Sequence, residues 1–508
     1  MKILNDLLED VSVENIHGNI ENPVSSISLD SRKIEQNSLF VAISGNVIDG
    51  HIFIDEVINK GAKTIIYEKD IKEFKSGVTY VKVPNTHEAI GIIASNFYDN
   101  PSRKMKLVGV TGTNGKTTTA TLLHQLFRDL GYKVGMIGTI VNKINDKSFE
   151  ACRTTPDSVT LNEILANMVN DGCEYCFMEV SSHAVCEKRI FGLSLIGGVF
   201  TNLTLDHLDY HKTFENYCEA KKGFFDILPA TGFAIANIDD ERGEYMLSTT
   251  KANKYTLSLK KSADVSAETS VKVDFTERLE TKLIGEFNAY NILGVYACAV
   301  CLGQNQAKLS DTGSPDASTE AFRDKVKEII KTLEPVAGRF QYIKSENEIT
   351  GIVDYAHTPD ALENVLKTVQ QLRGKKPPVG LVGTHQSDWW PKIITVVGCG
   401  GDRDKSKRPI MAKIGYEMSD ILILTSDNPR TEKPEDILND MQKGLPLDGV
   451  DNVEIIIDRH IAIQKACELA QKGDYILLAG KGHENYQEVN GVKHHFDDME
   501  ELQKYLYK

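Results

Sequence analysis

The chain has 508 residues, of which 41% are hydrophobic and 26% charged, as in a globular protein with room for about three domains. Its formal net charge of −14 at pH 7 argues against nucleic acid or an anionic membrane as the main partner. No apolar run approaches the ~20 residues that span a bilayer, and the N-terminal residues lack the apolar core of a signal peptide, so we expect a cytoplasmic protein.

The pattern of strands, helices and linkers predicts three units, residues 1–103, 104–336 and 337–508. The first unit ends with a helix over residues 86–98 and a polar linker. In the other two units strands alternate with helices, which predicts an α/β fold of mostly parallel sheets with helices on both faces. The expected strands are residues 38–43, 62–67, 133–137, 175–180, 197–201, 233–237, 393–397, 421–425 and 475–479.

Residues 107–118 read as a short apolar strand, a glycine-rich loop and the start of a helix. Such a loop turns backbone N–H groups toward an anion, and the helix dipole adds to the attraction. Lys116 can then reach the β and γ phosphates of a nucleotide, and the Thr117 hydroxyl can bind Mg²⁺. The strict template has glycine where Val110 stands, so the loop is a variant. The expected phosphate-binding residues are Gly112, Thr113, Asn114, Gly115, Lys116, Thr117 and Thr118.

Potential metal ligands follow two later strands of this unit. Glu179 and His183 stand at the carboxyl end of one strand, where ligands bind in open α/β sheets. Residues 200–211 contain two histidines and two aspartates after the next strand. These side chains can complete a Mg²⁺ site beside the ATP phosphates. Lys221 follows on an expected helix, and the pattern alone gives it no role beyond a surface lysine.

Nine cysteines are spread along the chain, an odd number that points to reduced thiols. Cys173 and Cys176 lead into an apolar strand, while Cys298 and Cys301 lie in an alanine-rich helical stretch. We expect packed core thiols and not a zinc site.

In the third unit, polar loops again follow apolar strands. Residues 398–408 are rich in glycine and basic side chains, and residues 427–430 and 480–484 each follow a strand. Three such loops at strand ends in one domain suggest a binding face for an anionic group.

These segments, in this order, resemble the Mur ligases, the ATP-dependent amide-forming enzymes of peptidoglycan synthesis. The matching motifs are residues 112–118, 179–183, 201–211, 285–291, 338–339 and 354–360, and the resemblance covers nearly the whole chain. It implies three domains: a UDP-MurNAc-binding domain over residues 1–103, a central P-loop-type ATP-binding domain over 104–336, and a Rossmann-like amino-acid-binding domain over 337–508. Within the family, the member that adds the third residue of the stem peptide is most similar.

The resemblance also implies the substrates, which are ATP, UDP-MurNAc-L-Ala-D-Glu and meso-diaminopimelate, and a monomeric enzyme. It places Asn288, Arg339 and Asp354 at the nucleotide, with Asp354 near the ribose. The residues expected at the UDP-MurNAc-peptide are Leu29, Ser31, Arg153, Thr154, Thr155, Ser181 and Arg189. Those expected at diaminopimelate are Arg403, Asp427, Asn428, Pro429, Arg430, Gly480 and Glu484.

By the same resemblance, Lys221 carries a carbamate formed with CO₂, which binds a second Mg²⁺ together with His207. The amine must be uncharged to react, whereas a free lysine has a pKa near 10.4, so the site has to favour the modified form. Lys116, Lys221 and His207 are the expected catalytic residues, and Thr117, Glu179, His183, His207 and Lys221 the expected metal ligands.

Arg430 favours diaminopimelate over lysine as the added amino acid. The two differ by a terminal carboxylate, which a guanidinium can bind with two parallel hydrogen bonds. The alternatives are the same ligase using L-lysine, a folylpolyglutamate-type ligase, and a non-catalytic nucleotide-binding regulator with this fold.

Two features depart from the family pattern. The stretch over residues 375–392 is longer than the family pattern predicts, and it carries both tryptophans of the chain. We expect a surface insertion or a partner contact there. Glu187 is acidic where a neutral amide is expected near the substrate.

Overall fold

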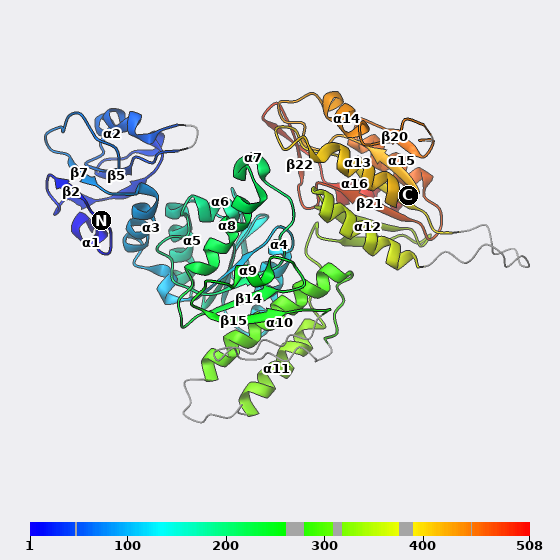
Figure 1. The fold of residues 1–508 in the computed structure, drawn as a ribbon, viewed down its shortest axis with the longest axis horizontal. Helices are drawn as coiled ribbons and strands as arrows, with labels where there is room; N and C mark the ends of the chain where they lie inside the picture. The colour runs from blue at the N-terminus through cyan, green and yellow to red at the C-terminus, as the bar shows by residue number, and fades with distance from the viewer. Residues whose placement is uncertain (46–47, 261–278, 308–316, 375–389, 449, 508) are drawn as a thin grey trace, which may run out of the picture.

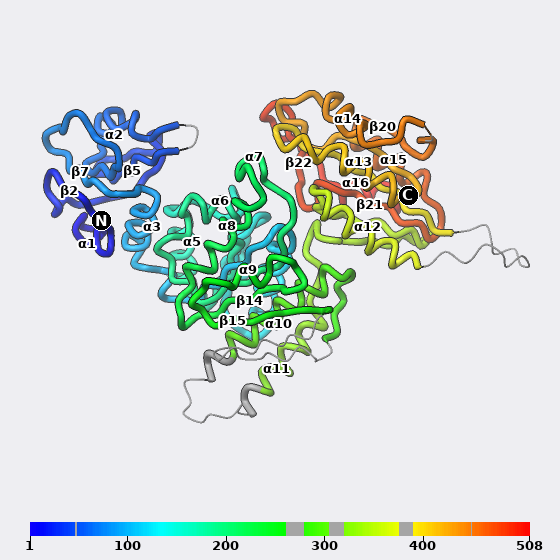
Figure 2. The backbone as a smooth tube through the Cα atoms, in the orientation of Figure 1, coloured from blue at the N-terminus to red at the C-terminus, as the bar shows by residue number. Residues whose placement is uncertain are grey.

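The protein consists of three α/β bodies, each built around its own sheet (Figure 1). The chain passes from the N-terminal body through the central body to the C-terminal one, as the backbone tube in Figure 2 shows. The computed structural model describes residues 1–45, 48–260, 279–307, 317–374, 390–448 and 450–507. Residues 1–103, 104–336 and 337–508 are kept as proposed domain bounds.

The N-terminal sheet has the strand order β2-β7-β6-β5-β4 and is parallel except for β2. Its strands are β2 (Asn15–His17), β4 (Ser26–Ser28), β5 (Ser38–Val41), β6 (Thr64–Tyr67) and β7 (Thr79–Lys82), while β1 (Lys2–Ile3) pairs separately with β3 (Pro23–Val24). Its helices are α1 (Leu4–Leu7), α2 (Ile54–Lys60) and α3 (Thr86–Phe97). Helix α3 packs against α5 of the central body and joins the two.

The central sheet has eight strands in the order β11-β10-β9-β12-β8-β13-β14-β15. They are β8 (Lys106–Thr111), β9 (Val134–Ile137), β10 (Val141–Ile144), β11 (Lys147–Glu150), β12 (Tyr175–Glu179), β13 (Leu195–Phe200), β14 (Phe233–Asn237) and β15 (Asn253–Leu257). The helices are α4 (Lys116–Asp129), α5 (Ser158–Asn170), α6 (Ser182–Cys186), α7 (Leu208–His211), α8 (Phe214–Asp226), α9 (Gly243–Met246), α10 (Glu286–Ala307) and α11 (Ala317–Ile330).

The C-terminal sheet has the order β16-β17-β21-β18-β19-β20 and is parallel except for β16. Its strands are β16 (Gln341–Lys344), β17 (Thr350–Asp354), β18 (Ile393–Val397), β19 (Ile421–Leu424), β20 (Val453–Ile455) and β21 (Tyr475–Ala479), and a hairpin of β22 (Tyr486–Val489) and β23 (Val492–His495) lies beside it. The helices are α12 (Pro359–Arg373), α13 (Lys407–Met418), α14 (Pro434–Gln442), α15 (Arg459–Leu469) and α16 (Asp498–Leu506).

Each large sheet is buried on both faces, as its continuous apolar strands predict. In the central body, α4 and α10 cover one face, and α5 and α8 cover the other. In the C-terminal body, α12, α13 and α14 oppose α15 and α16. Because the strands are mostly parallel, their carboxyl ends meet at one edge of each sheet, and the loops there can combine side chains distant in sequence.

The predicted α/β class and mostly parallel sheets are confirmed, with two local differences. The sequence pattern predicts a helix over about residues 118–130, whereas α4 begins at Lys116, because the phosphate loop leads directly into it. The antiparallel hairpin of β10 and β11 was not predicted, since its exposed outer strand lacks an apolar pattern. The four cysteines of the Cys-x-x-Cys pairs are buried free thiols, as expected.

Within the described ranges, none of the helices combines the length and the apolar character needed to cross a bilayer. Most of the tryptophan-containing segment, residues 375–389, lies outside the described residues. Trp390 follows it and lies under the Arg373 guanidinium, 5.7 Å from ring centroid to guanidinium carbon.

The C-terminal core contains a fully buried ion pair, from which we predict an effect of substitution on stability. Arg459 on α15 donates to Asp498 on α16 through Nε at 2.8 Å and Nη2 at 2.6 Å, and both side chains are 0% exposed. Replacing Arg459 by leucine leaves an uncompensated buried carboxylate, so we expect a loss of about 3–5 kcal/mol in the free energy of unfolding. Urea unfolding followed by circular dichroism measures it.

The matched control is the exposed pair between Lys60 and Glu56. Lys60→Ala should change the same free energy by less than ~1 kcal/mol, because water already solvates both charges. Equal losses of unfolding free energy in Arg459→Leu and Lys60→Ala would contradict the expected cost of breaking the buried pair.

Candidate functional site

The phosphate loop has a backbone shape that only glycine allows at two positions. Gly112 has a φ of +150°, and a Cβ there would lie 1.9 Å from Thr201 Oγ1. Gly115 has a φ of +87°, and a Cβ there would lie 2.4 Å from Asn291 Oδ1. Gly115 is also the N-cap of α4, so no side chain caps the first N–H groups of the helix. These N–H groups and the helix dipole form a site for an anion.

Lys116 curls back over this loop, its Nζ donating to the carbonyls of Gly112 at 2.9 Å and Thr113 at 2.8 Å. Burial lowers the pKa of Lys116. The next residue, Thr117, donates its hydroxyl to Glu179 Oε2 at 2.9 Å. A hydroxyl and a carboxylate in contact at the start of this helix are hard oxygen donors suited to Mg²⁺.

Lys221 on α8 is not a surface residue but is 1% exposed, and its Nζ donates to the Gly112 carbonyl at 2.7 Å. The ammonium also lies 4.6 Å from the centroid of the Tyr217 ring. Burial, reinforced by the charge of Lys116, holds the pKa of Lys221 well below its usual range. An uncharged amine at this position can react with CO₂, which the ammonium form cannot.

Three histidine rings gather beside this lysine. The ring centroids of His183 and His207 are 5.0 Å apart, and those of His183 and His211 are 5.5 Å apart. His211 is held by Ser182, its Nε2 lying 2.9 Å from the hydroxyl oxygen. Partial burial, together with nearby cations, lowers the pKa of His207 to about 4, so its ring is neutral at neutral pH and keeps a lone pair. The histidines can therefore serve as ligands.

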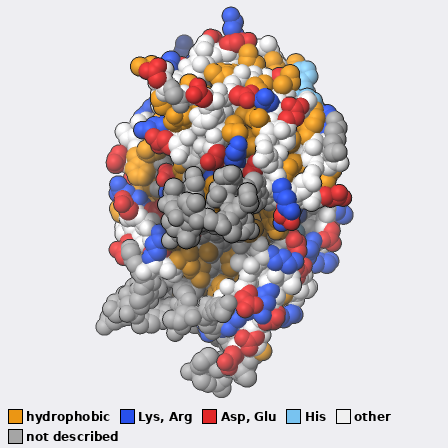
Figure 3. Space-filling model, turned by 90° about the vertical axis from the view of Figure 1, so that its right-hand side faces the viewer, with side chains coloured by type: hydrophobic (Ala, Val, Ile, Leu, Met, Phe, Trp, Pro, Cys, Tyr) orange, Lys and Arg blue, Asp and Glu red, His pale blue; other side chains and the backbone are white. Residues whose placement is uncertain are grey.

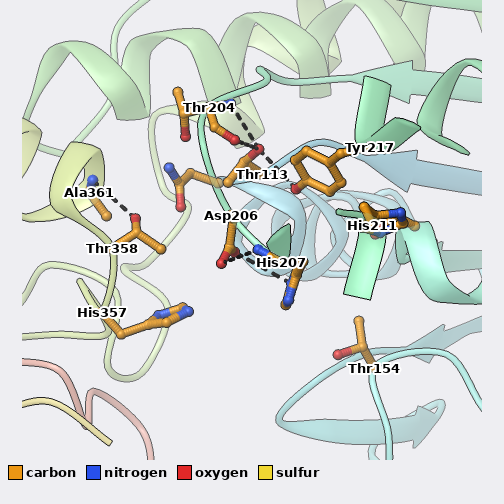
Figure 4. Close-up of polar contacts among 12 residues, drawn as sticks. Thr113, Thr154, Thr204, Asp206, His207, His211, Tyr217, His357, Thr358 and Ala361 are labelled. Carbon is orange, nitrogen blue, oxygen red and sulfur yellow. Dashed lines mark hydrogen bonds and ion pairs between the residues drawn. The ribbon is translucent and has the colours of Figure 1, made fainter. Parts of the chain in front are cut away.

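Asp206 lies between this group and the C-terminal body (Figure 4). Burial disfavours its charge, but the nearby His207, His357 and Lys407 lower the pKa of the carboxyl overall. His207 Nε2 is 3.4 Å from Asp206 Oδ2. The acidic group thus faces cationic and imidazole groups from two bodies.

Direct contacts also join the phosphate loop to the C-terminal body. Arg339 Nη2 donates to the Thr117 hydroxyl at 3.1 Å, and its guanidinium carbon lies 4.6 Å from the Tyr355 ring centroid. Asn114 Nδ2 donates to Asp360 Oδ2 at 3.0 Å across 246 residues of sequence. The structure therefore brings Arg339 to the phosphate-binding residues.

The other two residues expected at the nucleotide are buried. Asn288, near the start of α10, donates to the Ile284 carbonyl and accepts from Asn291. Asp354 accepts the Phe340 N–H at 2.6 Å, and burial raises its pKa to about 6.

On the side of the N-terminal body, Arg189 and Thr155 form a small polar network. Arg189 Nη1 donates to the Thr155 carbonyl at 2.8 Å, and the Thr155 hydroxyl donates to the Glu179 carbonyl and accepts the Ser181 N–H. Thr154 accepts from the Thr139 hydroxyl at 3.1 Å. Thr139 also donates its backbone N–H to Glu179 Oε1 at 2.8 Å, so the network reaches the Glu179 carboxylate.

Other residues expected at the UDP-MurNAc-peptide lie apart from this network. Arg153 is exposed. Leu29 and Ser31 belong to the N-terminal body, where Ser31 accepts from Lys60 through its carbonyl. Leu29 packs against the apolar core of that body, on which Val159 of the central body also packs.

Glu187, the acidic departure from the family pattern, pairs with Arg189. Its Oε2 accepts from Arg189 Nε at 2.9 Å and Nη2 at 2.6 Å, and Tyr210 donates to its other oxygen at 3.4 Å. The carboxylate holds Arg189 against the loop that contains Thr155.

In the C-terminal body, the loops 427–430 and 480–484 are linked side by side. Asn428 Nδ2 donates to Glu484 Oε2 at 2.6 Å. Gly480 has a φ of +114°, and a Cβ there would meet Asp427 Oδ2 at 2.6 Å. Burial and the Asp427 charge raise the pKa of Glu484.

Arg430 projects over the glycine-rich loop that precedes α13. Its Nη1 donates to the Gly401 carbonyl at 2.8 Å, and its Nε lies 3.5 Å from Glu488 Oε2. Arg403 is exposed and donates to the Asp402 carbonyl, and Pro429 is buried between the loops. The expected diaminopimelate residues thus lie on three adjoining loops.

Two charged residues of this region were missed by the sequence reasoning. Lys481 is 0% exposed between two residues predicted at the site, and the fully buried Arg408 binds Glu432 and Asp440. A lysine between two glycines was the only signal for Lys481, because a charged residue in a loop is usually solvated.

The outer face of the C-terminal body is shown in Figure 3. Acidic and basic side chains are interspersed across the described part of this face, and no extended area of one sign is seen there.

Family models match three segments of the chain: "Mur ligase family, catalytic domain" over residues 23–98, "Mur ligase middle domain" over 110–299, and "Mur ligase, glutamate ligase domain" over 338–482. Two curated relatives carry the name UDP-N-acetylmuramoyl-L-alanyl-D-glutamate–2,6-diaminopimelate ligase. The one from Cytophaga hutchinsonii is 48% identical over 97% of this chain and 97% of its own length. The one from Bacteroides fragilis is 47% identical over 99% of this chain and 98% of its own length.

A solved structure of a ligase of that name superimposes with a TM-score of 0.63 at 30% identity, covering 99% of this chain and 98% of its own. MurF from Acinetobacter baumannii has a TM-score of 0.59 at 16% identity, covering 94% and 95% of the two chains, and shows the shared fold. Together with the matched phosphate loop, the strand-end histidines and the three bodies, these similarities establish that the chain belongs to the Mur ligase family.

Proposed function

We propose that this protein is the ATP-dependent ligase that adds meso-diaminopimelate to UDP-MurNAc-L-Ala-D-Glu in peptidoglycan precursor synthesis. The observation that carries the proposal is the Arg339–Thr117 hydrogen bond. It joins the phosphate loop to the sheet whose strand ends bear the Asp427–Arg430 loop, so the three substrates can meet at one place. The names of relatives 46–48% identical over nearly the full chain support the same activity.

The chemistry runs in two steps. The γ-carboxylate of the D-glutamyl residue attacks the γ-phosphorus of ATP, which gives an acyl phosphate and ADP. The amine of diaminopimelate then attacks the acyl carbon, and inorganic phosphate leaves with the formation of the amide bond. No side-chain nucleophile takes part, so the protein acts by positioning the substrates and neutralising charge.

The phosphate loop residues suit the first step. Among the described residues, the Lys116 ammonium donates to two loop carbonyls, so it can turn to a phosphoryl group entering the loop. Arg339 contributes a second cation from the opposite body. Charge on the transferring group is stabilised by such preorganised donors.

The carboxylate, hydroxyl and imidazole groups of the site suit Mg²⁺. Thr117 and Glu179 would hold one ion, and His207 with a carbamylated Lys221 a second, with His183 nearby. When bound, Mg²⁺ neutralises phosphate charge and orients the phosphoryl oxygens. The buried Lys221 amine, with its lowered pKa, has the uncharged form that carbamylation needs.

The C-terminal loops suit an amino acid with a second carboxylate. Arg430 would bind the distal carboxylate, while Glu484 and Asp427 would face the ammonium of the same end. L-Lysine lacks that carboxylate and would place a cation against Arg430.

Substitution of Arg430 tests the choice of amino acid. We expect Arg430→Ala to lower kcat/KM for meso-diaminopimelate by about 100-fold or more, because a desolvated charge pair contributes several kcal/mol. Phosphate release from ATP in the presence of UDP-MurNAc-L-Ala-D-Glu measures it, with meso-diaminopimelate and L-lysine compared.

Arg128→Ala, which removes an exposed arginine of α4, is the control and should leave both rates unchanged. A wild-type preference for L-lysine would overturn the role of Arg430 while leaving the ligase activity. Absence of turnover with either amino acid, despite ATP binding, would favour a non-catalytic regulator.

Carbamylation of Lys221 is tested by removing CO₂. Enzyme prepared in CO₂-free buffer should lose activity and regain it when bicarbonate is added, because the carbamate forms reversibly on the uncharged amine. ¹³C NMR with labelled bicarbonate should show one carbamate carbon. In Lys221→Ala this signal should disappear, and kcat should fall by at least ~100-fold.

Lys222→Ala is the matched control, since this neighbour on the same helix binds Asp226 instead. It should keep both the carbamate signal and the bicarbonate response. Full activity of the wild-type enzyme without CO₂ would rule out the modification as a requirement.

A further inference from the structure

Lys481 is a fully buried cation beside the proposed amino-acid site, and the chemistry above gives it no part. Its side chain is 0% exposed, and it stands between Gly480 and Gly482, both with positive φ. Burying an ammonium is costly, and a well-packed apolar side chain is often as stable in such a place. Stability alone therefore does not explain a lysine here.

The hydrogen bonds of the Lys481 ammonium lead to the proposed site. Its Nζ donates to Asn428 Oδ1 at 3.2 Å and to the Tyr486 carbonyl, and it lies 3.4 Å from Glu484 Oε2. One ammonium thus binds the loop that ends in Arg430, the loop that carries Glu484 and the first strand of the β22–β23 hairpin.

These contacts fix the orientation of the Asn428 amide. An ammonium can only donate, and the Glu488 N–H also donates to Asn428 Oδ1, at 2.9 Å. The amide oxygen is therefore directed toward Lys481, and the Nδ2 group is left to donate to Glu484 at 2.6 Å. Lys481 orients the Glu484 carboxylate both directly and through Asn428.

Lys481 also sets the charge balance at Glu484. The charged and titratable groups facing this carboxylate are Asp427, Lys481, Arg459, Tyr355 and Tyr486. Arg459 is already paired with Asp498. Burial and Asp427 raise the pKa of Glu484, while Lys481 and the Asn428 hydrogen bond lower it. Lys481 is the cation in direct contact that opposes two adjacent carboxylates.

We propose that Lys481 is a positioning residue that keeps Glu484 ionised and aimed at the ammonium end of the incoming amino acid. The inference rests on the proposed function, because it assumes that Glu484 meets an amine substrate. It concerns binding of that substrate alone and leaves the phosphate loop unaffected.

The pH dependence of kcat/KM for meso-diaminopimelate tests it. Glu484 binds an ammonium only when ionised, that is, above its pKa, and loss of the adjacent positive charge raises that pKa. In K481Q, which keeps a hydrogen-bond donor but no charge, the acidic limb of the profile should move up by about one pH unit. At pH values below the wild-type limb, KM for meso-diaminopimelate should rise by about 10-fold while KM for ATP stays constant. In K481R, which retains the charge, the acidic limb of the profile should stay at its wild-type pH.

The matched control is R373M. Arg373 pairs with Asp420 at the opposite edge of the same sheet, before β19, at 2.5 Å. Removing that cation should leave the position of the acidic limb unchanged. The proposal would be overturned if the acidic limb of K481Q stayed at its wild-type pH, or if the limb of R373M moved by as much as that of K481Q.

A double variant separates electrostatics from folding. Because the charge acts through Glu484, K481Q should have no further effect on KM for meso-diaminopimelate in an E484Q background. If K481Q alone does not fold, normal folding of K481Q/E484Q supports the same coupling, and misfolding of both overturns it. A wild-type enzyme that does not use meso-diaminopimelate at all would instead remove the proposed function, and this inference with it.

Discussion

Two lysine side chains donate to one backbone carbonyl, that of Gly112, and much of the site depends on this arrangement. Lys116 reaches it from α4 at 2.9 Å and Lys221 from α8 at 2.7 Å. Two ammonium groups at one oxygen repel each other, and burial adds to the cost of their charge. Burial lowers the pKa of both lysines, and the charge of Lys116 lowers the pKa of Lys221 further, so that it lies well below its usual range. An anion between them relieves the repulsion, whether a phosphoryl group or a carbamate.

The same loop is where the central and C-terminal bodies meet. Arg339, just before β16, and Asp360, on α12, come from the C-terminal body and contact Thr117 and Asn114. Asp206 faces His357 and Lys407 across the same boundary. Each contact is polar and partly exposed, so its net contribution to stability is modest. Bodies joined in this way can separate and close around substrates without disrupting either core.

The C-terminal body places its charged groups differently, by burying them. Arg459, Arg408 and Lys481 are each 0% exposed and each contacts a carboxylate. Arg459 and Lys481 lie near the pair formed by Asp427 and Glu484. In a low-dielectric interior such charges interact strongly, so changing one alters the ionisation of the others. The acidic pair therefore depends on residues that a substrate would not touch.

The sequence by itself determined the α/β class, the phosphate loop and the strand-end position of most polar motifs. These follow from local rules: apolar runs form buried strands, and the two glycines of the loop permit conformations and close contacts that other residues cannot. Helix α8 was also predictable, but its lysine was read as solvated, because helical periodicity does not say which face is buried.

Only the tertiary structure decided that Lys221 meets the Gly112 carbonyl, that Arg339 reaches Thr117, and that Lys481 lies between Asn428 and Glu484. These contacts join residues 109, 222 and 53 positions apart in the chain. The burial that shifts each pKa comes from the packing of whole bodies. A local pattern contains neither the distance between such residues nor the loss of water around them, so the chemistry of these side chains depends on the folded chain.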